Sequence, residues 1–376
     1  MQIESMIAQG FRNLSAQQSI LSPGVNLILG QNGQGKTNFL ELIHFLATLK
    51  SFRDAQRKEI MAWGEPECQM KARVLSGPKD DLIEKDFSVV WNARTRKVQV
   101  NGNNQSDLVE YFRQIKSVCF CPEDLGVLHG YPIERRQFMD RLVFQCRPKH
   151  LTLVRAYQRV LKQRNTLLRQ WQEQGGNEPS ELGVWTEQMV DYASQLTQSR
   201  MEFLKRLNQV LPEQYSRVCG LDHEDGILEG AIQITRKGTS DSYREVYEEK
   251  RRQERFRGSS LWGPHLDDFV LMYGDKEARR FASTGQKKTL LLALRLCEMH
   301  LVQENFGEAP LLLMDDLSAE LDAKRLATLI QFLAEDLHRE GGVQAFITTV
   351  SSTFDVFEPL GDLHFYRMEH GRMTTV

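Results

Sequence analysis

Residues 25–37 read VNLILGQNGQGKT, and this stretch decides the fold. Its first five residues are mostly apolar and predict a buried strand, whereas the residues after Thr37 place apolar side chains at helical spacing. Between strand and helix, Gly30-x4-Gly35-Lys36-Thr37 matches the phosphate-binding loop pattern. The alternative is a chance match in a glycine-rich turn, which the eight matching residues and both flanks disfavour. We therefore expect an α/β fold of the P-loop type.

The residue types of this loop suit a nucleoside triphosphate. Glycines let backbone N–H groups turn toward a phosphate, and the start of the following helix adds a favourable partial positive charge. Lys36 has the length to reach the β- and γ-phosphates, and the Thr37 hydroxyl is a suitable ligand for Mg²⁺. The residues expected to contact the nucleotide are Gly30, Gln31, Asn32, Gly33, Gln34, Gly35, Lys36, Thr37 and Asn38.

A pair of aspartates follows the apolar run LLLM at 311–314. A P-loop requires an acidic side chain at the end of a buried strand to hold the metal ion. We expect Asp315 to take that place beside Thr37, and we expect Asp316 to polarise the attacking water. The alternative is an acidic turn after an ordinary strand, which the P-loop earlier in the chain disfavours.

Residues 281–296, FASTGQKKTLLLALRL, begin with small polar side chains and continue as an apolar helix. A serine hydroxyl and the free N–H groups at a helix start can form an anion site, here with Ser283, Gly285 and Gln286. Because the P-loop already holds the phosphates of the chain's own nucleotide, we expect this second site to contact the nucleotide of another copy. The simpler alternative is helix capping by Ser283 or Thr284.

Composition places the chain among globular proteins of more than one unit. It has 376 residues, of which 41% are hydrophobic, and a net charge of −2. No apolar run approaches the roughly 20 residues that cross a bilayer, so we expect no membrane partner. The six cysteines are scattered without a CxxC pair, which favours a reduced cytosolic compartment. A charge near zero argues against coating nucleic acid through overall charge but allows a local basic face.

Periodicity changes along the chain and suggests three segments. Strand-like runs occupy 2–8, 25–29, 69–75 and 86–91, and helical patterns occupy 149–172 and 181–212, joined by a Gly/Asn/Pro turn. Further strands are expected at 230–238, 263–274 and 344–349, further helices at 241–257 and 323–338, and a terminal hairpin at 364–376. We expect residues 1–118 and 226–376 to form the P-loop head, and residues 119–225 to form a helical lobe with an antiparallel hairpin.

These motifs together resemble one family, the RecF proteins of the SMC-like ABC ATPases, and the resemblance runs nearly end to end. It rests on FRNL at 11–14, KSFR at 50–53, the segment FCPEDLGVLHGYPIERRQFMD at 120–140 and YQRVLKQRN at 157–165. It also rests on GPHLDD at 263–268, on the signature-like stretch at 281–287, and on LSAELD at 317–322 after the two aspartates. The pattern of residues 122–138, which combines two prolines, acidic residues and two adjacent arginines, is far more specific than the P-loop pattern.

The resemblance implies an ABC/SMC-type ATPase head with ATP and Mg²⁺ as ligands, and a homodimer that forms when ATP is bound. Lys36, Thr37 and Asp315 of one copy and Ser283 and Gly285 of the other would then hold one nucleotide. It also implies a slow DNA-dependent ATPase that clamps DNA in recombinational repair, replication-fork maintenance and SOS induction. Other recombination-mediator proteins would be partners, in the cytoplasm and at the nucleoid. RecF-like heads further bring a residue such as Arg12 close to the nucleotide, although a surface arginine is the alternative.

Four features differ from the patterns of related ATPases. The signature reads Ala-Ser-Thr-Gly-Gln where ABC ATPases have Leu-Ser-Gly-Gly-Gln. Leu266 occupies a position where the family pattern has arginine. Asp316 stands where most ABC-type ATPases carry glutamate, whereas aspartate is usual at this position in RecF proteins. Finally, Thr348 and Thr349 end the strand that carries a switch histidine in transporters.

Residues 141–172 contain eight basic side chains and no acidic one. Arg155, Arg159 and Lys162 are spaced i, i+4, i+7 and therefore share one helix face, where they could neutralise DNA phosphates. The alternative is an ordinary solvated face. Arg135 and Arg136 are equally suited to DNA or to a structural pairing with Glu123 and Asp124.

Three other functions compete with ATP-dependent DNA binding. A nucleotide-switched scaffold that recruits partner proteins, with incidental DNA binding, remains compatible with the sequence. A transporter ATPase does not account for the segment 120–140. A nuclease would need a further cluster of metal-binding carboxylates, which the sequence does not display.

Overall fold

The computed structural model describes residues 1–53, 55–77, 81–121, 126–219, 232–237, 243–316, 323–337, 342–350 and 354–376. The chain divides into two compact units. The first unit comprises Met1–Leu125, Glu213–Gly226 and Ser283–Val376, and the second comprises Gly126–Pro212 and Ile227–Ala282. None of the helices in these ranges has the length and apolar character needed to cross a bilayer.

The first unit contains a largely parallel sheet with the strand order β15-β14-β3-β13-β12-β8. Only the last strand of the terminal hairpin runs antiparallel to its neighbour. The central strands are buried along nearly their whole length, which explains their continuous apolar runs. The strands are β3 (Val25–Leu29), β8 (Ser117–Phe120), β12 (Leu311–Met314), β13 (Ala345–Thr349), β14 (Leu363–Glu369) and β15 (Arg372–Thr375).

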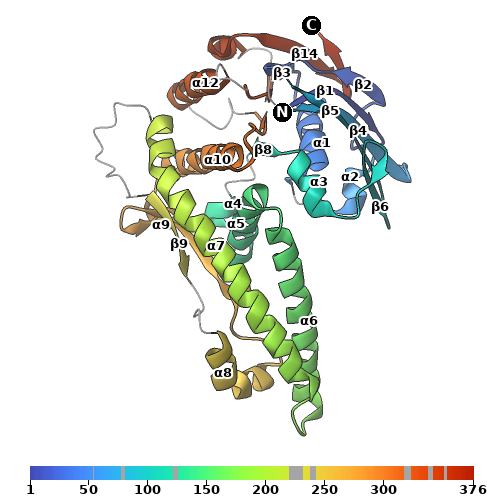
Figure 1. Cartoon of the computed structure of the whole chain (residues 1–376). Coiled ribbons are helices and arrows are strands. Elements are labelled where there is room, and N and C mark those ends of the chain that lie inside the picture. The colour runs from blue at the N-terminus through green and yellow to red at the C-terminus, as the bar shows by residue number, and fades with distance from the viewer. Residues whose placement is uncertain are drawn as a thin grey trace. The chain divides into compact units, whose positions relative to one another are not determined.

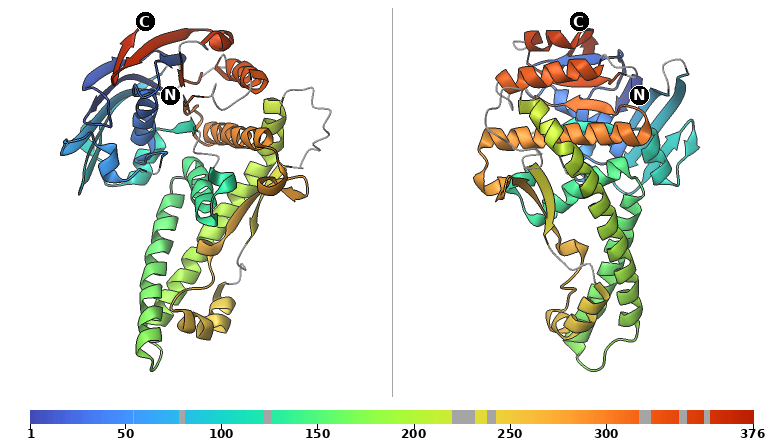
Figure 2. Two further views of the ribbon diagram at one scale, coloured as in Figure 1. Left: turned by 180° about the vertical axis from the view of Figure 1, so that it is seen from behind. Right: turned by 60° about the vertical axis from the view of Figure 1, so that its left-hand side comes forward.

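Helices cover both faces of this sheet (Figure 1). The helix after the P-loop, α1 (Lys36–Thr48), packs on one face, and α10 (Thr284–Phe306) and α12 (Ala323–Leu337) pack on the other (Figure 2). Leucines and isoleucines of α10 and α12 share one core with β3, β12 and β13. The short 3-10 segment η3 (Phe354–Leu360) closes this core through Phe357 and Leu360.

An antiparallel sheet with the order β2-β1-β4-β5-β6-β7 lies on the other side of α1 (Figure 1). Phe45 of α1 packs edge-on against Trp91 of this sheet, with ring centroids 5.0 Å apart. The strands are β1 (Gln2–Gln9), β2 (Gln17–Ile20), β4 (Glu67–Ser76), β5 (Ile83–Asn92), β6 (Arg96–Val100) and β7 (Asn103–Asn104), accompanied by α2 (Arg57–Ile60) and α3 (Leu108–Gln114).

The second unit is built around two long helices, α6 (His150–Gln174) and α7 (Glu181–Cys219), and the last turns of α7 count with the first unit. The predicted hairpin is therefore confirmed, but the predicted end of its second helix before Pro212 is wrong. Proline removes one helical hydrogen bond. The helix continues because Tyr215 and Val218 beyond the proline are buried, and burial of these apolar side chains outweighs the missing bond.

Shorter elements complete the second unit. They are α4 (Gly126–His129), α5 (Pro132–Cys146), β9 (Ile232–Lys237), α8 (Tyr243–Arg257), η2 (Pro264–Leu266), β10 (Asp268–Tyr273), β11 (Lys276–Glu277) and α9 (Ala278–Phe281). Buried ion pairs join them, since Arg200 binds both Asp140 and the fully buried Asp267. A second pair links Arg164 of α6 to Glu254 of α8 at 2.5 Å.

Candidate functional site

The phosphate-binding loop has the backbone geometry that its glycines predict. Gly35 precedes α1 with φ 112°, a left-handed conformation that other residues rarely adopt. At Gly30 the constraint is steric, because a Cβ at this position would lie 2.5 Å from the Met368 carbonyl oxygen. The loop therefore needs glycine at these two positions, and α1 begins directly behind it.

Lys36 lies against the loop that precedes it. Its Nζ donates hydrogen bonds to the carbonyl oxygens of Gly30 at 2.7 Å and Gln31 at 3.0 Å. Burial lowers the pKa of Lys36, and the nearby carboxylates of Asp316 and Asp315 oppose that shift. The ammonium group is thus held by the loop and faces the two predicted carboxylates.

Asp315 is held by hydroxyl groups from two distant segments. Its Oδ1 accepts hydrogen bonds from Thr37 Oγ1 at 2.9 Å and from Thr348 Oγ1 at 2.8 Å. The side chain is only 6% exposed, and this burial raises the pKa of Asp315, while the two hydroxyls favour the carboxylate. The structure therefore brings Thr37 and Asp315 together as predicted and adds Thr348, to which the sequence assigned no contact.

Asp316 has a constrained backbone. Its φ is 45°, in the left-handed region, and its N–H donates to Thr348 Oγ1 at 3.0 Å. A non-glycine residue in this region costs about 1 kcal/mol or more unless its surroundings fix it. Thr348 therefore supports both aspartates. The predicted segment 317–322 that follows them lies outside the described residues.

The donor set suits Mg²⁺. Thr37 Oγ1 and Asp315 Oδ1 are hard oxygen donors that lie 2.9 Å apart. They meet where the phosphate loop passes into α1. Magnesium prefers one or two such protein ligands together with phosphate oxygens and water. Among the described residues, no group of three or more His, Cys, Asp or Glu side chains is arranged to hold a metal ion by itself.

Arg12 was expected near the nucleotide, and in the structure its guanidinium binds Glu41 of α1. Arg12 Nε and Nη2 donate to the two carboxylate oxygens of Glu41 at 2.9 and 2.7 Å. Glu41 is fully buried and also accepts a hydrogen bond from Ser51 Oγ at 2.5 Å. Sequence reasoning missed Glu41, although its position four residues after Thr37 places it on the same face of α1.

Two of the quoted motifs meet beside the loop. Arg53 Nη1 lies 3.7 Å from a Glu41 oxygen and donates to Asn38 Oδ1 at 3.0 Å. Asn38 in turn donates to Asn13 Oδ1 at 2.7 Å. The segments FRNL and KSFR are therefore joined to α1 by polar side chains, and Asn38 serves as the link.

The C-terminal hairpin holds the loop from the opposite side. The N–H groups of His370 and Gly371 donate to Oε1 and the carbonyl oxygen of Gln34 at 2.6 and 2.8 Å. Gly371 also packs against residue 13, because a Cβ there would lie 1.9 Å from the Asn13 carbonyl oxygen. No sequence pattern indicated this contact, which joins residues more than 330 positions apart.

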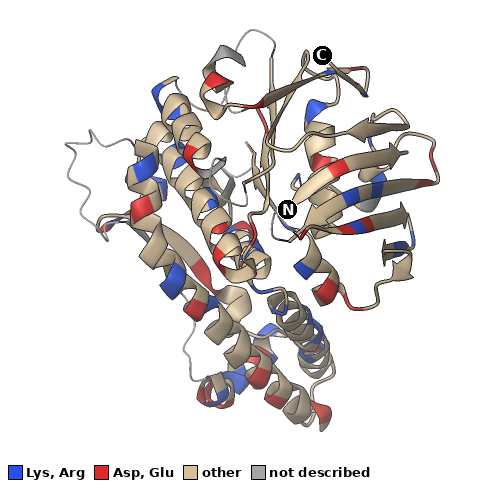
Figure 3. Ribbon diagram, turned by 45° about the horizontal axis from the view of Figure 1, so that its top comes forward, with Lys and Arg blue, Asp and Glu red and all other residues tan. Residues whose placement is uncertain are grey.

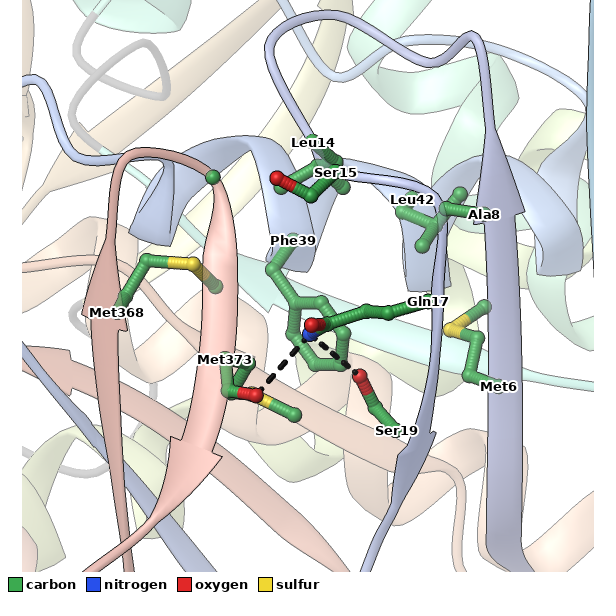
Figure 4. Close-up of a pocket in the computed structure, with 11 residues that line it drawn as sticks. Met6, Ala8, Leu14, Ser15, Gln17, Ser19, Phe39, Leu42, Met368 and Met373 are labelled. Carbon is green, nitrogen blue, oxygen red and sulfur yellow. Dashed lines mark hydrogen bonds between the residues drawn. The ribbon is translucent and has the colours of Figure 1, made fainter.

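A small cavity lies beside α1, between β1, β2 and the C-terminal hairpin (Figure 4). Its wall carries Phe39 and three methionines, and Gln17 crosses it to donate to the Met373 carbonyl oxygen at 3.1 Å. The cavity volume is only about 10 Å³, far below the roughly 300–1,000 Å³ of typical small-molecule sites. We regard it as packing space beneath the loop helix.

Ser283 and Gln286 form a capping box at the start of α10. Ser283 Oγ accepts from the Gln286 N–H at 3.2 Å, and Gln286 Oε1 accepts from the Ser283 N–H at 2.8 Å. The capping role, the simpler of the two alternatives, is therefore present, while Ser283 itself remains exposed. Gly285 lies close to Arg325, whose guanidinium would be 3.2 Å from a Cβ at that position.

The basic candidates differ in their surroundings. Arg135 is buried, with its guanidinium donating to both carboxylate oxygens of Asp268 at 2.6 and 2.9 Å. Arg136 donates to the Asp267 carbonyl oxygen at 2.6 Å. Both contacts agree with the structural alternative, although Glu123 and Asp124, the partners suggested for it, lie outside the described residues. Arg155, Arg159 and Lys162, by contrast, are all exposed on α6. Figure 3 marks the basic and acidic positions along the ribbon.

The chain is similar to known proteins in both sequence and structure. Residues 2–363 match the family model described as the RecF/RecN/SMC N terminal domain. The chain is 34% identical over 380 residues to "DNA replication and repair protein RecF" of Halalkalibacterium halodurans, covering 99% of each chain. A protein of the same name from Geotalea daltonii is 31% identical over 379 residues, covering 99% of this chain and 100% of that one.

Solved structures show the same fold. One solved structure, described as "Structure of the recombination mediator protein RecF-ATP in RecFOR pathway", is similar to this chain. The TM-score is 0.85 at 24% identity, and the match covers 100% of this chain and 97% of that one. An Smc head bound to the C-winged helix domain of ScpA gives a TM-score of 0.54 at 14% identity, covering 100% of this chain and 96% of that one. The predicted ABC/SMC-type head is thereby confirmed. From its family match and the length and identity of these alignments, the chain belongs to the RecF family.

Proposed function

We propose that this protein is an ATP-dependent DNA-binding protein that acts as a homodimer held together by ATP. The observation that carries the proposal is the convergence of Lys36, Thr37 and Asp315 behind a P-loop in a chain of the RecF family. The names of its relatives support roles in DNA replication, repair and recombination. We further propose that other recombination mediators are its partners, in the cytoplasm and at the nucleoid.

The loop residues and the two aspartates have different roles at the nucleotide. The backbone N–H groups of Gly33 to Thr37 and the Lys36 ammonium bind and orient the phosphates. Thr37 and Asp315 would hold Mg²⁺, whose chemistry would be to neutralise phosphate charge. Asp316 orients and polarises the attacking water. Its side chain is one methylene shorter than glutamate, which favours slow hydrolysis and a timed switch.

The start of α10 serves the nucleotide of the second copy. Ser283 is exposed, and the capping box uses the Gln286 N–H but not those of Thr284 and Gly285, which would be available to an anion. Two copies would thus enclose two nucleotides, each held by one P-loop and one α10 start. Loss of the γ-phosphate on hydrolysis would loosen the dimer and release DNA.

DNA contact is assigned to the exposed basic face of α6. Arg155, Arg159 and Lys162 are exposed and follow helical spacing, so they can neutralise successive phosphates. Arg136 is partly exposed and is a weaker candidate, and Arg135 is the weakest because its guanidinium is bound to Asp268.

The proposal is tested by measuring DNA affinity with and without a non-hydrolysable ATP analogue, on single-stranded, duplex and gapped DNA. We expect the analogue to raise the affinity of the wild-type chain at least tenfold. Lys36→Ala should lose this gain, because it binds the analogue poorly. An affinity that is weak and independent of the analogue would contradict the proposal and favour a nucleotide-switched scaffold for partner proteins.

A further inference from the structure

The C-terminal end of α8 packs against the C-terminal end of α6. Gln172 Nε2 of α6 donates to the Phe256 carbonyl oxygen at 2.5 Å. Gly258 follows in a left-handed conformation, and a Cβ there would lie 3.5 Å from the Arg169 Cα. Residues 256–258 therefore lie beside Arg169, within the second unit.

Phe256 turns its ring away from this contact. The preceding residues fix the helix, since Glu254 is buried against Arg164 and the Arg255 guanidinium lies 4.6 Å from the Trp171 ring centroid. The Phe256 side chain is nevertheless 80% exposed. A single exposed apolar side chain is ordinary in itself, but this ring projects from a backbone that is held on both sides.

The surroundings of the ring are basic. Arg252 precedes Phe256 by one helical turn and shares its face, Arg257 follows it, and both are exposed. Arg169 across the contact is exposed as well. No ion pair involves these three arginines among the described residues, so their charge faces solvent.

Arg169 also extends the basic face of α6. It follows Arg155 by 14 residues, which at about 100° per residue returns it to within about 40° of the same direction. Arg155, Arg159, Lys162 and Arg169 thus form a row about 21 Å long, with Glu173 one turn beyond it. This row of four basic residues leads along α6 to Phe256.

We propose that Phe256 is a stacking site for an unpaired base of a DNA strand whose phosphates lie on Arg169, Arg252 and Arg257. Cationic side chains around an aromatic ring are the arrangement with which proteins bind single strands, since the ring accepts any base and the cations track the backbone. An apolar protein surface would require apolar neighbours around Phe256, where this chain has arginines. The inference rests on the proposed DNA-binding function and refines it, because a stacked base requires a single-stranded end or gap.

The test compares Phe256→Ala with Val184→Ala, which shortens another exposed apolar side chain, 59% exposed, on α7 of the same unit. Affinity is measured for a single-stranded oligonucleotide carrying 2-aminopurine and for a blunt duplex, after thermal melting shows that both variants are folded. Base stacking contributes about 1–3 kcal/mol, so Phe256→Ala should weaken single-strand binding about 5- to 150-fold. Duplex affinity and the salt dependence of binding should stay unchanged, because no charge is removed. Phe256→Trp should restore binding and quench the 2-aminopurine fluorescence.

The outcomes separate this inference from the function on which it rests. If Phe256→Ala binds both forms of DNA as the wild type does, the stacking site is wrong while the DNA-binding function stands. An equal loss on single strand and duplex would also overturn it, because stacking acts only on unpaired bases. If the wild-type chain binds neither form of DNA, the proposed function fails first, and the inference fails with it.

Discussion

At the scale of single residues, the site depends on hydroxyls that bring distant segments together. Thr37 and Asp315 could be paired from the sequence, because the P-loop and an acidic strand end recur together. Thr348 could not, because its contact depends on β13 lying beside β12 in the register that pairs Met314 with Ile347. That register places the next residue, Thr348, against Asp315 and Asp316.

Thr348 should therefore position the two aspartates. Thr348→Val removes the hydroxyl with little change of volume and leaves both aspartates without this partner. Removal of a hydrogen bond to a charged group costs about 1.5–3 kcal/mol, so kcat for ATP should fall about 10- to 100-fold. The KM for ATP should change little because the loop and Lys36 hold the phosphates, and equilibrium binding of a labelled ATP analogue in Mg²⁺ reports this separately.

Two variants control this prediction. Thr348→Ser keeps the hydroxyl and should recover most of the turnover. Thr349→Val alters the adjacent buried threonine, whose Oγ1 donates to the Val350 carbonyl oxygen, and should turn over like the wild type. Equal defects at 348 and 349 would show a general packing effect and contradict a positioning role.

His265 of the GPHLDD segment makes the stability of the second unit depend on pH. Its Nδ1 lies 2.6 Å from the Tyr157 hydroxyl and its Nε2 lies 3.3 Å from the Ser260 carbonyl oxygen. Burial lowers the pKa of His265 to about 4, and the charges of Arg136, Arg164 and Arg200 act in the same direction.

A lowered histidine pKa means that the folded state disfavours the proton. Above pH 6.5 the ring is neutral in both states, and between pH 6.5 and 4 only the unfolded chain takes up the proton. The free energy of unfolding should therefore fall by about 3 kcal/mol across this window from His265 alone. Denaturant unfolding of the wild type and His265→Gln at a series of pH values measures the difference. Parallel pH profiles for the two chains would refute the assignment.

At the scale of elements, periodicity predicted most helices and strands but not their ends. The helices of the hairpin, the strands around the P-loop and the terminal hairpin agree with their predicted positions to within a few residues. The extension of α7 through Pro212 was not predicted, because a propensity rule cannot include the burial of Tyr215 and Val218. The strand β8 was also missed, since four residues at 117–120 carry too short a pattern to identify.

The basic face of α6 is the element on which DNA binding can be tested by charge. Reversal of Arg155, Arg159 and Lys162 to glutamate should weaken duplex binding strongly and reduce the slope of log K against log salt by about 0.9 for each phosphate that is no longer neutralised. A control variant reverses Lys205 and Arg206, two basic residues that are exposed on α7. Affinity measured by fluorescence anisotropy at several salt concentrations should change only for the α6 variant. Identical slopes for all chains would place the DNA elsewhere.

At the scale of the whole molecule, the fold class could be predicted from one loop, whereas the supports of that loop could not. Ser51, Arg53 and the hairpin residues His370 and Gly371 contact the loop or its helix from separate segments. Such contacts depend on how the sheets pack around α1, and no local pattern reports that packing. The predicted partner site at Ser283 differs again, because in the proposed dimer a second copy of the chain would complete it.

The ATP-held dimer is the central claim, and light scattering with a non-hydrolysable ATP analogue tests it most directly. The wild-type chain should double its mass when the analogue and Mg²⁺ are added. Ser283→Arg places a bulky side chain at the start of α10, remote in sequence from the P-loop, and should bind the analogue with wild-type affinity yet remain a monomer. A Ser283→Arg chain that still doubles its mass with the analogue would contradict the account.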